Sequence, residues 1–256
     1  MNIIITCAGK SKRFKKQGIN TPKFLLPVDE TTVISKILDA YDDSDNFHIV
    51  LTDKQLIKNP KIKTYLKNLK KNVFLNIIKE HDKGPCFSGV QAKSCYSKKD
   101  IIISYCDFLI DWDYKKFKRE IFEYDFGITS FKGFHPSSFS GTLYCYLQVK
   151  KNEIINLKEK QSFTSNPSNE NASVGSYYFK NFELFKEYST RALKSSKFLK
   201  QYNEIYASLP YLFLIKEKKK ILNFEVNKFI SLGTPKDYSE YLNWYNFFKI
   251  EKNLKN

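Results

Sequence analysis

The stretch "IIITCAGKSKRFKKQGINTPKF", residues 3–24, joins an apolar segment to a loop that is dense in positive charge. Residues 3–6 read as a buried β-strand, because the apolar run is continuous. The loop then carries Gly9, Arg13 and several lysines before it closes on Lys23. Like charges crowded into one loop repel each other, so we expect an anion to bind there. A glycine directly after the strand lets the backbone approach such a ligand, and free amides in the turn form an anion-binding concavity.

Phosphate is the anion that these residue types fit best. The Arg13 guanidinium can hold phosphate oxygens bidentately, and Lys23, stiffened by the proline before it, can supply a point charge. The letters "AGKS" match the end of a Walker A loop, but the earlier glycine of that motif falls at Ile4, and no G-x-G-x-x-G follows the strand. The loop therefore predicts a phosphate site of another kind, with a solvated basic loop as the alternative.

The first half of the chain alternates between strand and helix patterns. The predicted strands are Ile3–Thr6, Phe47–Thr52, Val73–Ile78 and Ile101–Cys106, and the predicted helices are Val33–Tyr41, Lys61–Lys70 and Phe87–Tyr96. Such alternation predicts βαβ units, so we expect a Rossmann-like α/β fold with a mostly parallel central sheet flanked by helices. Doubly wound sheets of this type bind ligands at the carboxyl ends of their strands.

The second half is richer in β patterns. The predicted strands are Phe126–Phe131, Thr142–Val149, Ile154–Leu157, Val174–Phe179 and the strand-like run Ile221–Gly233, and the predicted helices are Phe182–Leu193, Phe198–Ala207 and Pro235–Phe248. There is no internal repeat and no long linker. We therefore expect one domain over residues 1–256, with β insertions in its second half.

Composition excludes several classes of protein. The chain of 256 residues has a net charge of +16, but only three of its basic residues are arginines, which argues for a dispersed lysine coat and against a nucleic-acid partner. No apolar run is long enough for a membrane span, and no signal peptide is evident, so we expect a cytoplasmic protein. Five cysteines without C-x-x-C spacing are expected to be buried apolar residues.

A carboxylate ends the fourth predicted strand, in "IIISYCDFLID". Asp107 should lie at the carboxyl edge of the sheet, near the end of the first strand, where a magnesium ion that bridges phosphate oxygens needs one or two carboxylates. A helix N-cap is the alternative role for this residue. The nearby Asp111 and Asp113 imitate the D-x-D metal motif of glycosyltransferases, but they precede a helical pattern, and we assign them to capping.

The opening loop resembles the sugar nucleotidyltransferases, that is, the nucleoside-diphosphate-sugar pyrophosphorylases and their cytidylyltransferase relatives. The resemblance lies in A-G-(x)3-R-F followed by P-K. It implies that the loop, including Ala8, Gly9, Lys10 and Ser11, holds the nucleotide and that Arg13 and Lys23 contact its triphosphate. The chain departs from the commoner glycine-rich loop at positions 10–12, where the family often has small residues.

Further stretches along the chain support this resemblance. "KGPCFSG" is similar to the segment that passes the base in the family, which implies nucleotide contacts for Lys83, Gly84 and Pro85; an ordinary turn before a helix is the alternative. In the family the strand-end aspartate, here Asp107, binds the metal. The order of the motifs along nearly the whole chain carries more weight than any one of them.

The middle of the chain resembles a family branch of surface polysaccharide synthesis, and its end resembles the closing G-T-P-x-D of the family. The pair in "EKQSFTSNP" and the glycine of "GSYYF" imply an acceptor pocket lined by Glu159, Lys160 and Gly175, although an exposed ion pair would give the same letters. The closing "GTPKD" reads as a helix start capped by Thr234, with Asp237 in its first turn. Ser231 stands where many relatives carry a second metal-binding aspartate, so the sequence leaves open whether Asp237, Glu225 or water completes a metal site.

The resemblance implies a Mg²⁺-dependent nucleotidyltransferase. The expected partners are a nucleoside triphosphate, held by residues 1–125, and a sugar 1-phosphate, held by residues 126–256. Arg13, Lys23 and Asp107 are the expected catalytic residues, and Asp107 and Asp237 the expected metal ligands. Three alternatives stay open: a glycosyltransferase that uses Asp107 or the Asp111/Asp113 pair, a cytidylyltransferase for a non-sugar phosphate such as phosphocholine, and a non-catalytic nucleotide-binding subunit. The sequence also leaves homo-oligomer formation open.

Overall fold

The computed structural model describes residues 1–95, 99–133 and 142–254. Within these residues, nine strands form one sheet in the order β5-β4-β1-β6-β11-β8-β12-β10-β9. Its first four strands are parallel and come from the first half of the chain: β5 (Val73–Ile78), β4 (Asn46–Thr52), β1 (Asn2–Thr6) and β6 (Ile101–Tyr105). The predicted α/β fold is therefore confirmed, and the parallel order places the ends of β1 and β6 side by side.

The rest of the sheet is mixed rather than parallel. It consists of β11 (Asn171–Phe179), β8 (Phe126–Phe131), β12 (Ile221–Glu225), β10 (Glu153–Glu159) and β9 (Cys145–Lys150). Strand β8 is parallel to β12 and antiparallel to β11. Strand β11 is also antiparallel to β6, where it joins the parallel part of the sheet. Two small sheets pair β7 (Phe108–Asp111) with β13 (Lys228–Ser231), and β2 (Pro27–Val28) with β3 (Thr31–Thr32).

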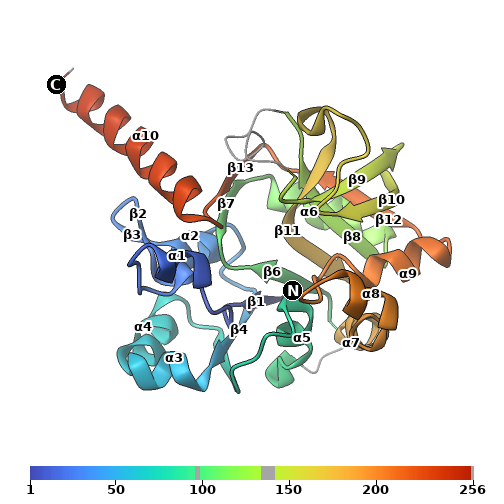
Figure 1. Ribbon diagram of the computed structural model, residues 1–256, viewed down its shortest axis with the longest axis horizontal. Helices are drawn as coiled ribbons and strands as arrows, with labels where there is room; N and C mark the ends of the chain where they lie inside the picture. Colours follow the sequence, from blue (N-terminus) through green and yellow to red (C-terminus); the bar gives the residue numbers. More distant parts are fainter. Residues whose placement is uncertain (96–98, 134–141, 255–256) are drawn as a thin grey trace.

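Helices surround the sheet (Figure 1). The α-helices of the described residues are α1 (Lys12–Lys16), α2 (Val33–Asp39), α3 (Asp53–Lys58), α4 (Lys61–Leu69), α5 (Pro85–Val90), α6 (Tyr114–Glu120), α7 (Phe182–Lys194), α8 (Ser196–Gln201), α9 (Pro210–Lys216) and α10 (Pro235–Leu254). Short 3₁₀ helices are η1 (Lys23–Leu25), η2 (Lys93–Cys95), η3 (Ile121–Glu123) and η5 (Pro167–Asn169).

The core has two main clusters on opposite faces of the sheet. Ile3 and Ile5 of β1 join the cluster that contains α2 and α6 residues, while Ile4 joins the one beneath α7 and α9. A strand covered on both faces has no polar side, which explains why the opening run is apolar throughout. All five cysteines are buried and free, as predicted. In the described parts of the chain, no helix combines the length and apolarity that crossing a bilayer requires.

Two predictions about the second half are wrong. The predicted helix Phe198–Ala207 ends as α8 at Gln201, and the chain then runs without regular structure to α9, which begins at Pro210 and was not predicted. The proline sets the start of α9, because its missing amide suits the first helical position. The strand-like run Ile221–Gly233 is broken into β12 and β13, which belong to different sheets. Tyr96, the predicted end of the third helix, and residues 134–141 lie outside the described residues.

Candidate active site

A cavity of about 610 Å³ opens at the carboxyl ends of β1 and β6. This volume is in the range of small-molecule sites. Its walls come from both halves of the chain: the opening loop, the segment after β5, the end of β6, the end of β10, the middle of β11, the segment after α8 and the start of α10. The predicted site residues that line it are Ala8, Gly9, Lys10, Ser11, Arg13, Lys23, Gly84, Pro85, Asp107, Glu159, Lys160, Gly175 and Asp237.

The opening loop is fixed to the core at Phe14 and is exposed at the neighbouring Arg13. Ser11 adopts a left-handed backbone (φ 51°) that leads into the short helix α1, and the Phe14 side chain of α1 is fully buried. Arg13, one residue earlier, is exposed on the cavity wall. Among the described residues its guanidinium makes no ion pair or hydrogen bond, so its donors face the cavity without a protein acceptor.

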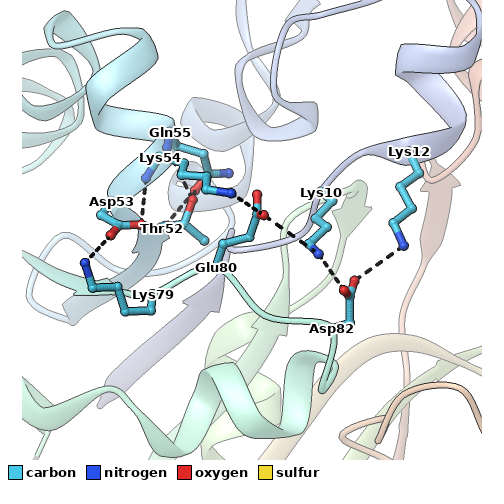
Figure 2. A network of polar contacts seen from close by, with 9 residues as sticks. All are labelled: Lys10, Lys12, Thr52, Asp53, Lys54, Gln55, Lys79, Glu80 and Asp82. Atoms are coloured by element: carbon cyan, nitrogen blue, oxygen red, sulfur yellow. Dashed lines mark hydrogen bonds and ion pairs between the residues drawn. The ribbon is translucent and has the colours of Figure 1, made fainter.

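The lysines of this loop are paired with protein carboxylates, which corrects the expectation that only a bound anion could offset them. Lys10 lies 2.5 Å from Asp82 and 3.8 Å from Glu80, and Lys12 lies 3.4 Å from Asp82 (Figure 2). Both acids come from the segment after β5. Charge crowding in the sequence alone therefore overstated the need for a ligand, because the partners lie about 70 residues away in the chain.

Lys23 and Asp107 meet on the cavity wall. The Lys23 ammonium lies 3.0 Å from the Asp107 carboxylate, at the junction of β6 and β7. Burial alone would lower the pKa of Lys23, but the charge of Asp107 and its hydrogen bond outweigh burial and raise the pKa. Lys23 therefore stays protonated, and it is available as a fixed positive charge beside the carboxylate.

A divalent cation would find oxygen donors around Asp107. An added Cβ at Gly233 would lie 3.4 Å from the Asp107 carboxylate and 3.5 Å from the Ser231 hydroxyl, so both groups border the same glycine. Ser231 also donates to the Asp237 carboxylate over 3.2 Å. In the described residues, no group of three or more His, Cys, Asp or Glu side chains is placed to hold a metal. The residues fit Mg²⁺, which keeps several waters and needs only one or two carboxylates beside substrate phosphates.

Asp237 has a structural role at the start of α10. Its carboxylate accepts a hydrogen bond from the Thr234 amide at 3.2 Å, and the Asp237 amide donates to the Thr234 hydroxyl at 3.1 Å. This reciprocal pair is a capping box with aspartate at its third position, as the sequence predicted. Because the carboxylate already serves the helix, Asp107 is the stronger candidate for a metal ligand.

The segment after β5 brings Gly84 and Pro85 to the cavity but not Lys83. The Lys83 ammonium lies over the Phe87 ring, 4.7 Å from its centroid, and the side chain is not part of the cavity wall. Gly84 has a φ of +89°, and an added Cβ would lie 2.6 Å from the Ile205 carbonyl oxygen, so only glycine fits. The prediction of a nucleotide contact thus has geometric support at Gly84 and Pro85 and lacks it for the Lys83 side chain.

Glu159 and Lys160 leave β10 on the opposite side of the cavity. Glu159 is half-buried, accepts a hydrogen bond from Ser208, and has a pKa raised to about 7, chiefly by burial. The Lys160 ammonium lies 4.3 Å from the centroid of the Tyr206 ring and donates to the Tyr206 hydroxyl. The two side chains therefore have separate partners and do not form the exposed ion pair that was the alternative interpretation.

Position 175 needs a glycine because the Tyr105 ring packs against it. Its φ is +96°, and an added Cβ would lie 2.8 Å from the Tyr105 ring. The Tyr105 hydroxyl in turn accepts a hydrogen bond from the Ala207 amide at 3.1 Å. Gly175 thus makes room for an aromatic side chain that lines the cavity.

The segment 203–208 was not predicted as part of the site, although it supplies Tyr206 to the cavity wall and Ser208 as the hydrogen-bond partner of Glu159. Its helix-like apolar spacing hid it, although the proline at position 210 was a signal that a helix could not simply continue. Tyr105 was also missed, because an aromatic residue at a strand end resembles ordinary core.

The acidic pair at 111–113 lies away from the cavity. The Asp113 carboxylate accepts from the Lys116 amide at 2.8 Å and caps α6, as predicted. The same prediction is wrong for Asp111, which ends β7 and pairs with Lys228 of β13. Neither Asp111 nor Asp113 is part of the cavity wall. The D-x-D interpretation therefore has no support from this geometry.

Comparisons with known proteins agree with this fold. A nucleoside-diphosphate-sugar pyrophosphorylase from Vibrio cholerae RC9 superposes with a TM-score of 0.75 at 18% identity, over 95% of this chain and 100% of that one. A UDP-glucose pyrophosphorylase complexed with UDP-glucose gives a TM-score of 0.73 at 18% identity, over 96% of this chain and 98% of that one.

Sequence comparison gives a relative among the curated proteins. The "Bifunctional protein GlmU" of Methanocaldococcus jannaschii is 26% identical over 190 residues, which are 73% of this chain and 42% of that protein. The chain thus matches less than half the length of this curated relative. No family model matches the chain. At these identities the superpositions establish the fold. Both structural neighbours are pyrophosphorylases of the family that the opening loop resembles.

Proposed function

Starting from the shared fold of the sugar-phosphate nucleotidyltransferases, we propose that this protein joins a nucleoside triphosphate to a sugar 1-phosphate. The acceptor phosphate attacks the α-phosphorus, the bond between the α-phosphorus and the bridging oxygen breaks, and pyrophosphate leaves with that oxygen. The products are a nucleoside-diphosphate sugar and pyrophosphate. The observation that carries the proposal is that Arg13, Lys23 and Asp107 share one cavity with Lys160, which comes from the other half of the chain.

Charge and position account for most of the catalysis in this proposal. Arg13 offers unpaired donors to the triphosphate, and Lys23 supplies a fixed positive charge where negative charge builds up on the leaving pyrophosphate. Asp107 would hold Mg²⁺, which when bound neutralises charge on the phosphates. Lys160 approaches from the other wall and would orient the acceptor phosphate, so that the two reacting groups are held together.

Gly84 and Glu159 complete the proposed subsites. Gly84 and Pro85 line the cavity and would pass along the nucleoside, while the missing side chain of Gly84 lets this segment pack against the Ile205 backbone. Glu159, half-buried and hydrogen-bonded to Ser208, would accept hydrogen bonds from sugar hydroxyls. A role in surface glycan synthesis, a cytoplasmic location and the division into a nucleotide half (1–125) and an acceptor half (126–256) are parts of the same proposal, supported by the sequence patterns alone.

The test is a substrate panel for pyrophosphate release with Mg²⁺. CTP, UTP, dTTP, GTP and ATP are each combined with a set of sugar 1-phosphates and with phosphocholine. We expect release that needs one triphosphate and one sugar 1-phosphate together. Release only with phosphocholine would favour the non-sugar alternative, and turnover of a nucleotide sugar without pyrophosphate would favour a glycosyltransferase. Triphosphate binding without turnover of any pair would indicate a binding subunit.

A further inference from the structure

The segment 203–208 lies between the two proposed subsites and forms hydrogen bonds with residues of both. On the nucleotide side, the Ile205 amide donates to the Lys83 carbonyl and the Ile205 carbonyl accepts from the Cys86 amide, each at 3.1 Å. These two bonds span Gly84, whose Cα faces the Ile205 backbone so closely that a Cβ would collide with it at 2.6 Å. The segment 83–86, called the nucleotide loop below, is therefore packed backbone against backbone with the segment 203–208.

On the acceptor side, Tyr206 and Ser208 of the same segment contact the two predicted acceptor residues. Tyr206 contacts Lys160 through its ring and its hydroxyl, and Ser208 donates to Glu159. Between them, the Ala207 amide donates to Tyr105 at the end of β6. A displacement of Ile205 would consequently move the partners of both Lys160 and Glu159.

The anchor of the segment is apolar. Ile205 is buried in a small cluster with Cys86 of α5, Ala192 of α7, Phe198 of α8 and Leu209. Because this cluster joins α5, which follows the nucleotide loop, to the helices of the second half, the segment has little freedom to move independently of that loop.

We propose that the segment 203–208 couples the nucleotide loop to the acceptor subsite, with Tyr206 as the residue that positions Lys160. The proposal rests on the nucleotidyltransferase function for the identity of the two ligands. Lys160 is exposed and its long side chain is flexible, so an isolated ammonium would sample many rotamers. The Tyr206 ring and hydroxyl restrict it and engage one of its three N–H donors. The other two have no acceptor among the described residues and can bind an acceptor phosphate. Restriction before binding lowers the entropy cost of binding.

The first experiment needs no substrate. Gly84→Ala introduces the Cβ that collides with Ile205, and hydrogen–deuterium exchange then reports on the Ile205 and Ala207 amides, which are bonded to Lys83 and Tyr105. We expect both amides to exchange about tenfold faster than in the wild type. Gly18→Ala is the matched control: Gly18 has a φ of +78°, but nothing lies within 4 Å of an added Cβ. Wild-type exchange at both amides in a folded Gly84→Ala protein would overturn the coupling.

The second experiment is kinetic and uses the triphosphate and sugar 1-phosphate that give the fastest pyrophosphate release in the panel. Tyr206→Leu should raise the acceptor KM about tenfold and leave the triphosphate KM within about twofold, whereas Tyr206→Phe, which keeps the ring, should recover most of the loss. Combined with Lys160→Ala, Tyr206→Leu should add little to the acceptor KM, because the two residues act as a unit.

The outcomes separate the two proposals. An equal change of both KM values, or additive effects of Tyr206→Leu and Lys160→Ala, would overturn the positioning role of Tyr206 while the enzyme remained a nucleotidyltransferase. Silence of the wild type with every pair would overturn the proposed function, and exchange at Ile205 and Ala207 would still decide the coupling. If Gly84→Ala does not fold, Ile205→Val, which loosens the same buried anchor, takes its place in the exchange experiment with the same two outcomes.

Discussion

The two walls of the cavity hold their lysines in different ways. On the wall formed by the opening loop and the segment after β5, the proposed nucleotide wall, the Lys10 ammonium pairs with the carboxylates of Asp82 and Glu80 (Figure 2). On the acceptor wall, Lys160 has an aromatic ring and a hydroxyl as its partners. Exposed ion pairs are weak and exchange readily with other ions, whereas a ring restricts a cation without neutralising it. Under the proposed function, this difference would let phosphate oxygens displace protein carboxylates on the first wall and would hold the Lys160 ammonium in place on the second.

Between the walls, Asp107 should give the largest effect on activity. Asp107→Asn keeps the shape of the side chain but removes the charge beside Lys23 and the proposed metal ligand, so we expect turnover to fall by more than about 10³-fold. The measurement is steady-state pyrophosphate release. Asp113→Asn is the control, because asparagine also caps a helix and Asp113 lies outside the cavity wall. Equal losses in the two variants would remove the special role of Asp107.

Arg13 should give the next largest effect. Its guanidinium has no protein acceptor among the described residues, so Arg13→Ala removes donors that only a ligand can use. We expect kcat to fall by about 10²–10³-fold if these donors act mainly in the transition state. Lys16→Ala removes an exposed cation of the same helix that is not part of the cavity wall, and it should leave kcat unchanged. An unchanged kcat in Arg13→Ala would refute the role.

Glu159 sharpens the comparison through pH. Its pKa of about 7 lies above the ordinary 4.5, so between these values the folded protein keeps a proton that the unfolded chain has lost. This contribution to stability is present at low pH and is lost as pH rises through 7. From pH 5 to pH 8 we expect the wild type to lose about 2 kcal/mol of unfolding free energy relative to Glu159→Gln, allowing for partial exposure.

Urea unfolding of both proteins at the two pH values measures this difference. Glu187→Gln, an exposed glutamate of α7, is the control and should show no such change. A wild type that gains stability relative to Glu159→Gln toward pH 8 would contradict the raised pKa.

Asp82 should give the smallest effect, and in the opposite direction. Asp82→Asn frees Lys10 and Lys12 for phosphate, so the triphosphate KM should fall about twofold to threefold at low salt and return to the wild-type value as salt rises. Asp53→Asn breaks a similar pair, with Lys79 at 2.8 Å, away from the cavity and should not change KM. A higher triphosphate KM in Asp82→Asn would show that Asp82 supports the loop rather than competing with the ligand.

The parts of the site that lie at strand ends could be predicted from the sequence. The apolar run of β6 stops abruptly at Asp107, and parallel strands bring their carboxyl ends to one edge, so its place beside the opening loop follows from local pattern and topology. The start of α10 followed from its capping residues in the same way.

The parts that depend on long-range packing could not be predicted. The pairing of Lys10 with Asp82 joins residues 72 positions apart, and no local pattern encodes it. The segment 203–208 has no regular structure of its own, and its path is set by Ile205 in a cluster from three helices. A short apolar pattern cannot distinguish such an anchored loop from the end of a helix.

The most direct test of the central claim is to follow the label of the triphosphate. With the active pair from the panel, α-labelled triphosphate is used in one reaction and γ-labelled triphosphate in another. The account predicts that the α-label enters the nucleoside-diphosphate sugar, that the γ-label leaves as pyrophosphate, and that both transfers are lost in Asp107→Asn. An α-label released as free nucleoside diphosphate, or a γ-label released as inorganic phosphate, would contradict it.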